Sequence, residues 1–247
     1  MNVVEFCSEA SIQNQMNIWL EENRDKKIID IKYCADENSS SALIIYKEGV
    51  TLMENRVKEN REKILSLLSS IKRPGIEKLI EWIEVKSDFF IAPASTRFHS
   101  NYQGGLAEHS LLVYERFKEK NSHYDLGLSE ESIIICGILH DICKCNFYKA
   151  TTRNKKDETT GQWIKVPFYT VEDELPLGHG DKSVIMLQNF IKLKREEMLA
   201  VRWHMGGYVS PNDYNTVSAA WGMCKCGVCL HTADLEASYL YEEHIEY

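Results

Sequence analysis

The sequence predicts an α+β protein, in which a small βαββ domain precedes a larger, mainly helical domain with an inserted β-hairpin. Three observations support this fold class. Residues 1–49 pass from strand-like alternation to helical spacing and back. Residues 50–247 show mostly helical spacing, and the stretch at about 147–176 interrupts it with two β-like runs. A chain of 247 residues is long enough for a domain of ordinary size and a smaller one.

The first 49 residues contain the elements of the small domain in order. Residues 3–6 favour a short strand, and the apolar residues between positions 11 and 23 recur at close to helical spacing. Residues 28–34 alternate between apolar and polar, as a half-buried strand does. A polar turn at 37–41 then leads to another strand candidate at 42–46. We therefore expect the order strand, helix, strand, strand.

The remaining residues predict helices with one interruption. Residues 50–88 are amphipathic with a break at 73–75, and several helices joined by polar loops follow from Phe89 onward. The β-like runs are residues 147–152 and 163–171, separated by the polar segment 154–161. This pattern predicts a long β-hairpin. We expect it to act as a flap that controls access to the active site, although a decorative or dimer-forming hairpin has the same sequence signature.

Composition limits the classes of function. The formal net charge is −8, which argues against a uniformly basic face for nucleic acid. The first ten residues do not resemble a signal peptide, and no stretch is apolar enough to span a membrane. We therefore expect a cytoplasmic protein without a membrane partner, whose eight cysteines are reduced thiols. Cys224, Cys226 and Cys229 would supply three zinc ligands where a structural site usually has four, so we expect packing thiols.

Histidine and aspartate residues recur in five short motifs along the helical part. Each motif alone is weak, because a single histidine at a helix end is common. Asp234 is more informative, since it lies in an apolar helix where an unpaired carboxylate costs several kcal/mol. Imidazole nitrogens and carboxylate oxygens are typical ligands of first-row divalent metals. The candidate ligands, in chain order, are His109, His140, Asp141, His179, His204 and Asp234.

These motifs together resemble a known superfamily. The phrases are GGLAEHSLLVYERF, ILHDICK, LGHGDKS, RWHM and HTADLEAS. They resemble the HD-domain metal-dependent phosphohydrolases over roughly residues 60–245, and in particular the catalytic domain of bacterial HD-type 3′→5′ exoribonucleases. In the N-terminal part, IIDIKY and SALIIY resemble a small sporulation-associated domain.

The resemblance implies roles for the candidate ligands. His109, His140, Asp141 and Asp234 would hold a first metal ion, and Asp141 would bridge to a second ion. His179 and His204 match the additional histidines of the two-metal members. One or two divalent ions, Mn, Fe, Co, Ni or Zn, would then activate a water molecule that attacks phosphorus.

Further residues are candidates for substrate contact. Lys144 follows the His-Asp pair in the arrangement His-Asp-x-x-Lys, where members of the superfamily often place a catalytic or phosphate-binding lysine. Lys182 lies at an expected helix start, where backbone N–H groups favour anions. Arg97 and His99 could clamp a phosphate, and for each of these residues an ordinary surface role is the alternative. We expect His231 to have an orienting or core role rather than to bind metal.

The predicted function is hydrolysis of phosphate esters of nucleotides or of short nucleic-acid ends. A nucleotidase or dNTP hydrolase is one alternative, and a non-catalytic HD module that senses a nucleotide is another. The complete set of ligands argues against the sensor. A base could stack on the aromatic residues of the hairpin, which are Tyr148, Trp163, Phe168 and Tyr169.

Overall fold

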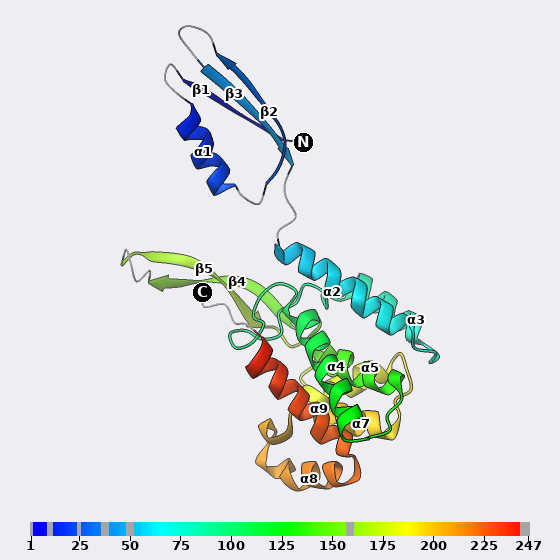
Figure 1. Ribbon diagram of the computed structural model, residues 1–247. Helices are drawn as coiled ribbons and strands as arrows, with labels where there is room; N and C mark the ends of the chain where they lie inside the picture. Colours follow the sequence, from blue (N-terminus) through cyan, green and yellow to red (C-terminus); the bar gives the residue numbers. More distant parts are fainter. Residues whose placement is uncertain are drawn as a thin grey trace. The chain divides into compact units, whose positions relative to one another are not determined.

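The computed structural model describes residues 2–8, 12–23, 26–35, 40–47, 52–156 and 161–242. The chain divides into two compact units, Met1–Arg56 and Val57–Tyr247 (Figure 1). The prediction of a domain boundary at residue 49 stays a prediction. No described helix is long and apolar enough to cross a membrane.

The first unit has the predicted βαββ order. It contains β1 (Asn2–Ser8), α1 (Gln13–Glu22), β2 (Lys27–Ala35) and β3 (Ser40–Lys47). The strands form an antiparallel sheet in the order β1-β3-β2, so the central strand is the last in sequence. Ala42 and Ile44 of β3 are buried because alternate residues of a strand share one face. Trp19 of α1 packs against that sheet through the rings of Phe6 and Tyr46.

The second unit is mainly helical, as predicted. Its helices are α2 (Leu52–Ser69), α3 (Ile76–Glu81), η1 (Trp82–Lys86), α4 (Gly105–His123), α5 (Glu130–Leu139), η2 (Ile142–Lys144), α6 (His179–Gln188), α7 (Arg195–Arg202), η3 (Gly206–Tyr208), η4 (Pro211–Asp213), α8 (Tyr214–Met223), α9 (Lys225–Glu236) and η5 (Ala237–Tyr241). The predicted break at 73–75 separates α2 from α3. Helix α4 packs against both α5 and α9 (Figure 1).

The core of this unit explains why α5 is apolar on all sides. Residues 132–139 are all buried, because α5 lies inside the helical layer rather than on its surface. Gly137 permits the close approach of α4, since a Cβ at this position would lie 2.5 Å from the Cα of Tyr114. The end of α5, where the His-Asp pair follows, is thereby held next to α4.

The predicted hairpin is present between η2 and α6. Its strands are β4 (Tyr148–Lys156) and β5 (Trp163–Val171), paired antiparallel from Tyr148↔Val171 to Lys156↔Trp163. One detail differs from the prediction: residues 154–156 belong to β4, whereas the sequence assigns them to the polar tip. A two-stranded ribbon exposes both faces, so polar side chains do not end the strand. The remainder of the predicted tip, residues 157–160, lies outside the described residues.

Cys224 and Cys226 lie close together at the start of α9, with their Cα atoms 5.3 Å apart. The expectation that the cysteines are reduced thiols stays a prediction. Cys229 is free and buried. Among the described residues, the groups that could hold a metal include none of these three cysteines.

Candidate metal centre

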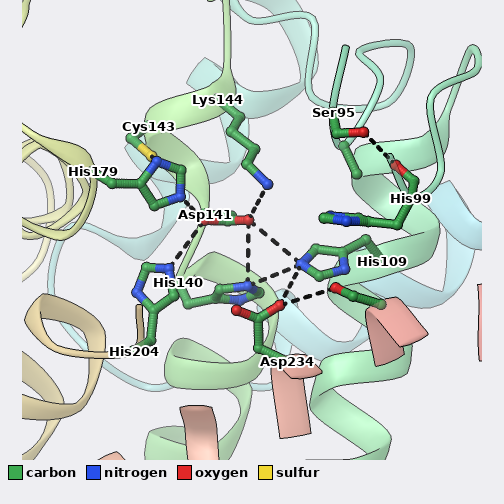
Figure 2. A network of polar contacts seen from close by, with 12 residues as sticks. Ser95, His99, His109, His140, Asp141, Cys143, Lys144, His179, His204 and Asp234 are labelled. Atoms are coloured by element: carbon green, nitrogen blue, oxygen red, sulfur yellow. Dashed lines mark hydrogen bonds and ion pairs between the residues drawn. The ribbon is translucent and has the colours of Figure 1, made fainter. Parts of the chain in front are cut away.

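Five elements of the second unit bring the candidate ligands to one place (Figure 2). His109 lies in α4, the pair His140-Asp141 follows α5, and Asp234 lies in α9. His179 begins α6 and His204 follows α7. We call these six side chains the His/Asp cluster.

Gly180 allows His179 and His204 to lie close together. A Cβ at Gly180 would lie 2.0 Å from the carbonyl oxygen of Arg202, so only glycine allows α6 to pack this closely against the end of α7. The imidazole rings of His179 and His204 are consequently 5.3 Å apart, measured between their centroids. Separate regions of the sequence thus form one side of the cluster.

Hydrogen bonds to backbone carbonyl groups fix which ring nitrogen of His140 and of His204 faces the cluster. The Nδ1 of His140 lies 2.9 Å from the carbonyl oxygen of Gly137, and the Nδ1 of His204 lies 2.7 Å from that of Val201. A carbonyl oxygen can only accept, so both Nδ1 atoms donate and both Nε2 atoms keep a lone pair. Nε2 of each ring points into the cluster, which is the arrangement that metal-binding histidines adopt.

His109 is oriented in the same way, by a carboxylate. Its Nδ1 lies 2.6 Å from Oε1 of Glu242, and both side chains have no exposed surface. The Nε2 atom therefore faces the cluster, where it lies 3.2 Å from Nε2 of His140. The same Nε2 is 3.4 Å from Asp141 Oδ2 and 3.4 Å from Asp234 Oδ1.

These separations fit ligands of a common ion. Atoms that each lie about 2.0–2.2 Å from a first-row metal, at tetrahedral or octahedral angles, are roughly 3–3.5 Å from one another. The groups His109, His140 and Asp234, and His140, Asp141 and His204, each satisfy the requirement of closely spaced ligand atoms. The donor set therefore fits a divalent metal of the class that the sequence predicts.

Asp141 lies at the centre of the cluster and faces two groups of ligands (Figure 2). Its Oδ2 faces His109 and is 2.6 Å from Nζ of Lys144. Its Oδ1 lies 2.6 Å from Nε2 of His179 and 3.3 Å from Nε2 of His204. The two oxygens of one carboxylate thus serve opposite sides, which is the geometry required of a bridging ligand.

The electrostatics keep the carboxylate charged. Burial acts to raise the pKa of Asp141, but Lys144 and the surrounding imidazoles outweigh burial and hold that pKa well below its usual range. Burial lowers the pKa of His140 to about 3. Burial also opposes protonation of His109, but the carboxylates around it, above all Glu242, raise its pKa to about 10. In the absence of metal, a proton on His109 is the positive charge that the carboxylates attract.

The other predicted residues divide into two groups. Lys144 contacts Asp141, and the ring of His99 stacks on that of His109 with centroids 5.1 Å apart. Arg97 is exposed and packs over the ring of Phe98. Lys182 is buried and pairs with Asp173 at 2.6 Å. The structure therefore brings Lys144 and His99 to the cluster and places Arg97 and Lys182 in other contacts.

Two further residues, His231 and Glu242, contact histidines of the cluster. His231 donates from Nδ1 to the carbonyl oxygen of His204 at 2.6 Å, which agrees with the orienting role expected for it. The sequence does not predict the contact of Glu242 with His109. Glu242 follows η5, beyond the last motif, and no spacing rule distinguishes it from the other glutamates of the chain.

Comparison with known proteins gave one match. A family model described as HD domain matches residues 106–237, a span that includes every member of the His/Asp cluster and excludes Glu242. No curated protein and no solved structure matches the chain.

Proposed function

We propose that this chain, which belongs to the HD-domain family, hydrolyses phosphate esters of nucleotides or of short nucleic-acid ends. Membership of the family implies metal-dependent phosphohydrolase chemistry in general. The observation that carries the proposal is the approach of two imidazole nitrogens, Nε2 of His109 and Nε2 of His140, to 3.2 Å.

That approach calls for a cation. Because Nδ1 of each ring already donates a hydrogen bond, the two Nε2 atoms would present lone pairs to each other. Two lone pairs repel unless a positive charge lies between them. A proton on Nε2 of His109 would remove the repulsion between these two nitrogens alone. A divalent ion at the same place could also be held by Asp141 and Asp234.

The chain's residues suggest two adjacent ion positions. His109, His140, Asp141 and Asp234 would hold one ion, and Asp141 together with His179 and His204 would hold another. A bound divalent ion supplies Lewis acidity, which activates water and offsets charge on the phosphate oxygens.

Lys144 is the side chain best placed to act on the substrate. It is buried, its Nζ contacts Asp141, and burial is outweighed by the charge of Asp141, which raises its pKa. A permanently charged ammonium beside the cluster can pair with a phosphate oxygen and favour the charge that develops during hydrolysis. Its proton stays on Nζ at neutral pH.

The proposal is tested with the purified chain of 247 residues. Release of product from a generic phosphodiester, a phosphomonoester and a set of nucleotides is measured with Mn²⁺ and with EDTA. We expect release only with metal. Asp141→Ala should abolish it, and Asp30→Ala, an exposed aspartate of β2, should not. Nucleotide binding without turnover at any metal concentration would contradict the proposal and support a sensing module.

A further inference from the structure

A cavity of about 590 Å³ opens directly onto the His/Asp cluster. Asp141, His179 and Asp234 line one part of it, together with Lys144. A phosphate ester could therefore place its phosphate at the cluster and its organic group in the cavity. The size is within the usual range for pockets that bind small organic molecules.

The remainder of the wall is mostly apolar and rich in aromatic rings. Phe98, Tyr148, Tyr208 and Tyr239 contribute to it, and we call these four side chains the aromatic wall. Phe98, Tyr208 and Tyr239 are 69%, 66% and 74% exposed, and Arg97 packs over one face of the Phe98 ring, so the other ring surfaces are available to a ligand. Large aromatic side chains left in water at the mouth of a cavity are typical of a binding surface.

Two of these tyrosines lie in short helices that directly follow cluster residues. Tyr208 belongs to η3 and Tyr239 to η5. The first follows His204 by a few residues and the second follows Asp234, so both rings are attached to elements that carry the cluster. Their position relative to a bound phosphate is therefore fixed by the same backbone.

The charges of the cavity limit the number of phosphates. Among the described residues that line it, Lys144 is the single lysine or arginine. A phosphate monoester brings about two negative charges, whereas a triphosphate or a strand brings more and usually requires additional cations or a basic track. Apart from the ions proposed at the cluster, the lining thus adds one positive charge, which suits one phosphate attached to one planar, largely apolar group.

We propose that the aromatic wall binds the base of a nucleoside monophosphate whose phosphate lies at the His/Asp cluster. This inference rests on the proposed function and names its substrate class. In the reaction, the oxygen of water bonds to phosphorus and the ester P–O bond breaks. One proton of that water ends on the nucleoside hydroxyl, and the products are the nucleoside and inorganic phosphate.

The inference differs from the sequence expectation in one respect. Of the hairpin aromatics, Tyr148 alone lines the cavity among the described residues. Trp163 is exposed near the far end of the ribbon, and the ring of Phe168 is covered by Arg153. The base would consequently stack on residues of loops and short helices of the helical unit.

The test compares two substrates that differ only in the base. With Mn²⁺, kcat/KM is measured for a nucleoside 5′-monophosphate and for ribose 5-phosphate. We expect the nucleotide to be preferred by about 5- to 150-fold, the range expected from one base stacked on an aromatic side chain. Tyr239→Ala and Tyr208→Ala should each reduce this ratio, while Tyr239→Phe, which keeps the ring, should preserve most of it.

Tyr124→Ala is the matched control, because Tyr124 is an exposed tyrosine that does not line the cavity. It should leave both rates unchanged. Equal rates for the two substrates, or a preference that survives in both Tyr→Ala variants, would overturn the inference. A nucleoside triphosphate or a longer oligonucleotide used far better than the monophosphate would also overturn it.

The failure of the proposed function can be recognised separately. If the wild-type chain with Mn²⁺ releases product from none of the phosphodiester, phosphomonoester and nucleotide substrates, hydrolysis is refuted. Calorimetric titration of the nucleoside monophosphate in the presence of Mn²⁺ then tests whether the nucleotide binds in the cavity. Binding that weakens in Tyr239→Ala supports the aromatic wall, and no binding by the wild type refutes it.

Discussion

Replacing Glu197 by Gln removes a buried charge that ties together three parts of the helical unit. Glu197 is 1% exposed and lies in the first turn of α7, the helix that leads to His204. Its two carboxylate oxygens accept hydrogen bonds from both terminal nitrogens of Arg73, at 2.6 and 2.9 Å. They also accept from the Ser132 hydroxyl of α5 at 2.8 Å and from the backbone N–H of Lys194 at 2.7 Å.

The expected cost follows from what the substitution leaves behind. Glutamine keeps the shape of the side chain but leaves the guanidinium of Arg73, whose side chain is 9% exposed, without its main counter-charge. Removing one partner of a buried ion pair destabilises proteins by about 3–5 kcal/mol. Because Glu131 also lies near Arg73, at 3.7 Å, we expect a value near the lower end, about 3 kcal/mol.

Urea unfolding of the helical unit, followed by circular dichroism, measures this free energy. Glu196→Gln is the matched control: it makes the same chemical change at the neighbouring, partly exposed position and should cost less than about 0.5 kcal/mol. A Glu197→Gln midpoint that coincides with that of the wild type would refute the reasoning.

The pH dependence provides a further check on Glu197. Burial acts to raise its pKa, but Arg73 and the other donors outweigh burial, so the folded-state pKa is below its ordinary value of 4.5. A lowered carboxyl pKa contributes stability that is present above the unfolded value and is lost as the pH falls through the folded value. The difference in stability between wild type and variant should therefore be full at pH 6 and should shrink below about pH 4.5.

Three other perturbations test separate parts of the account. Glu242→Ala deprives Nδ1 of His109 of its acceptor and should weaken Mn²⁺ binding about 10- to 100-fold, as measured by calorimetry; unchanged affinity would show that Glu242 has no orienting role. A chain that starts near Lys47 should keep its metals and its turnover, because every cluster residue lies in the second unit; a folded but inactive product would refute this. Deletion of residues 154–161 should change the relative rates on small and large substrates, and an unaltered selectivity profile would count against the flap.

The members of the His/Asp cluster could be identified in the sequence because the metal binding expected of them restricts both residue type and position. Asp234 illustrates this, since a carboxylate within an apolar helix requires a positive partner. His140 and Asp141 end the apolar run of α5, which places them where a buried helix reaches the cluster. The alternation of residues 28–34 and the polar turn after it were similarly sufficient for the small sheet.

For other residues the sequence does not predict the contacts that they make, because these contacts depend on the tertiary structure. Lys182 belongs to the same motif as His179 but pairs with Asp173 of the loop after β5, and Arg97 packs over its neighbour Phe98. Glu242 reaches His109 from the opposite end of the helical unit's sequence. The aromatic wall combines rings from η3, η5, a loop and the start of β4, whereas the sequence drew attention to the hairpin alone.

The central claim is that the His/Asp cluster holds divalent metal, and crystals grown with Mn²⁺ test it most directly. The anomalous signal of manganese locates the ion independently of any assumption about the ligands. We predict a peak roughly 2 Å from Nε2 of His109, Nε2 of His140 and a carboxylate oxygen of Asp141. A second peak is predicted on the side of His179 and His204, about 3.5–4 Å from the first. Saturating Mn²⁺ with no peak inside the cluster, and with the two Nε2 atoms still in contact, would contradict the account.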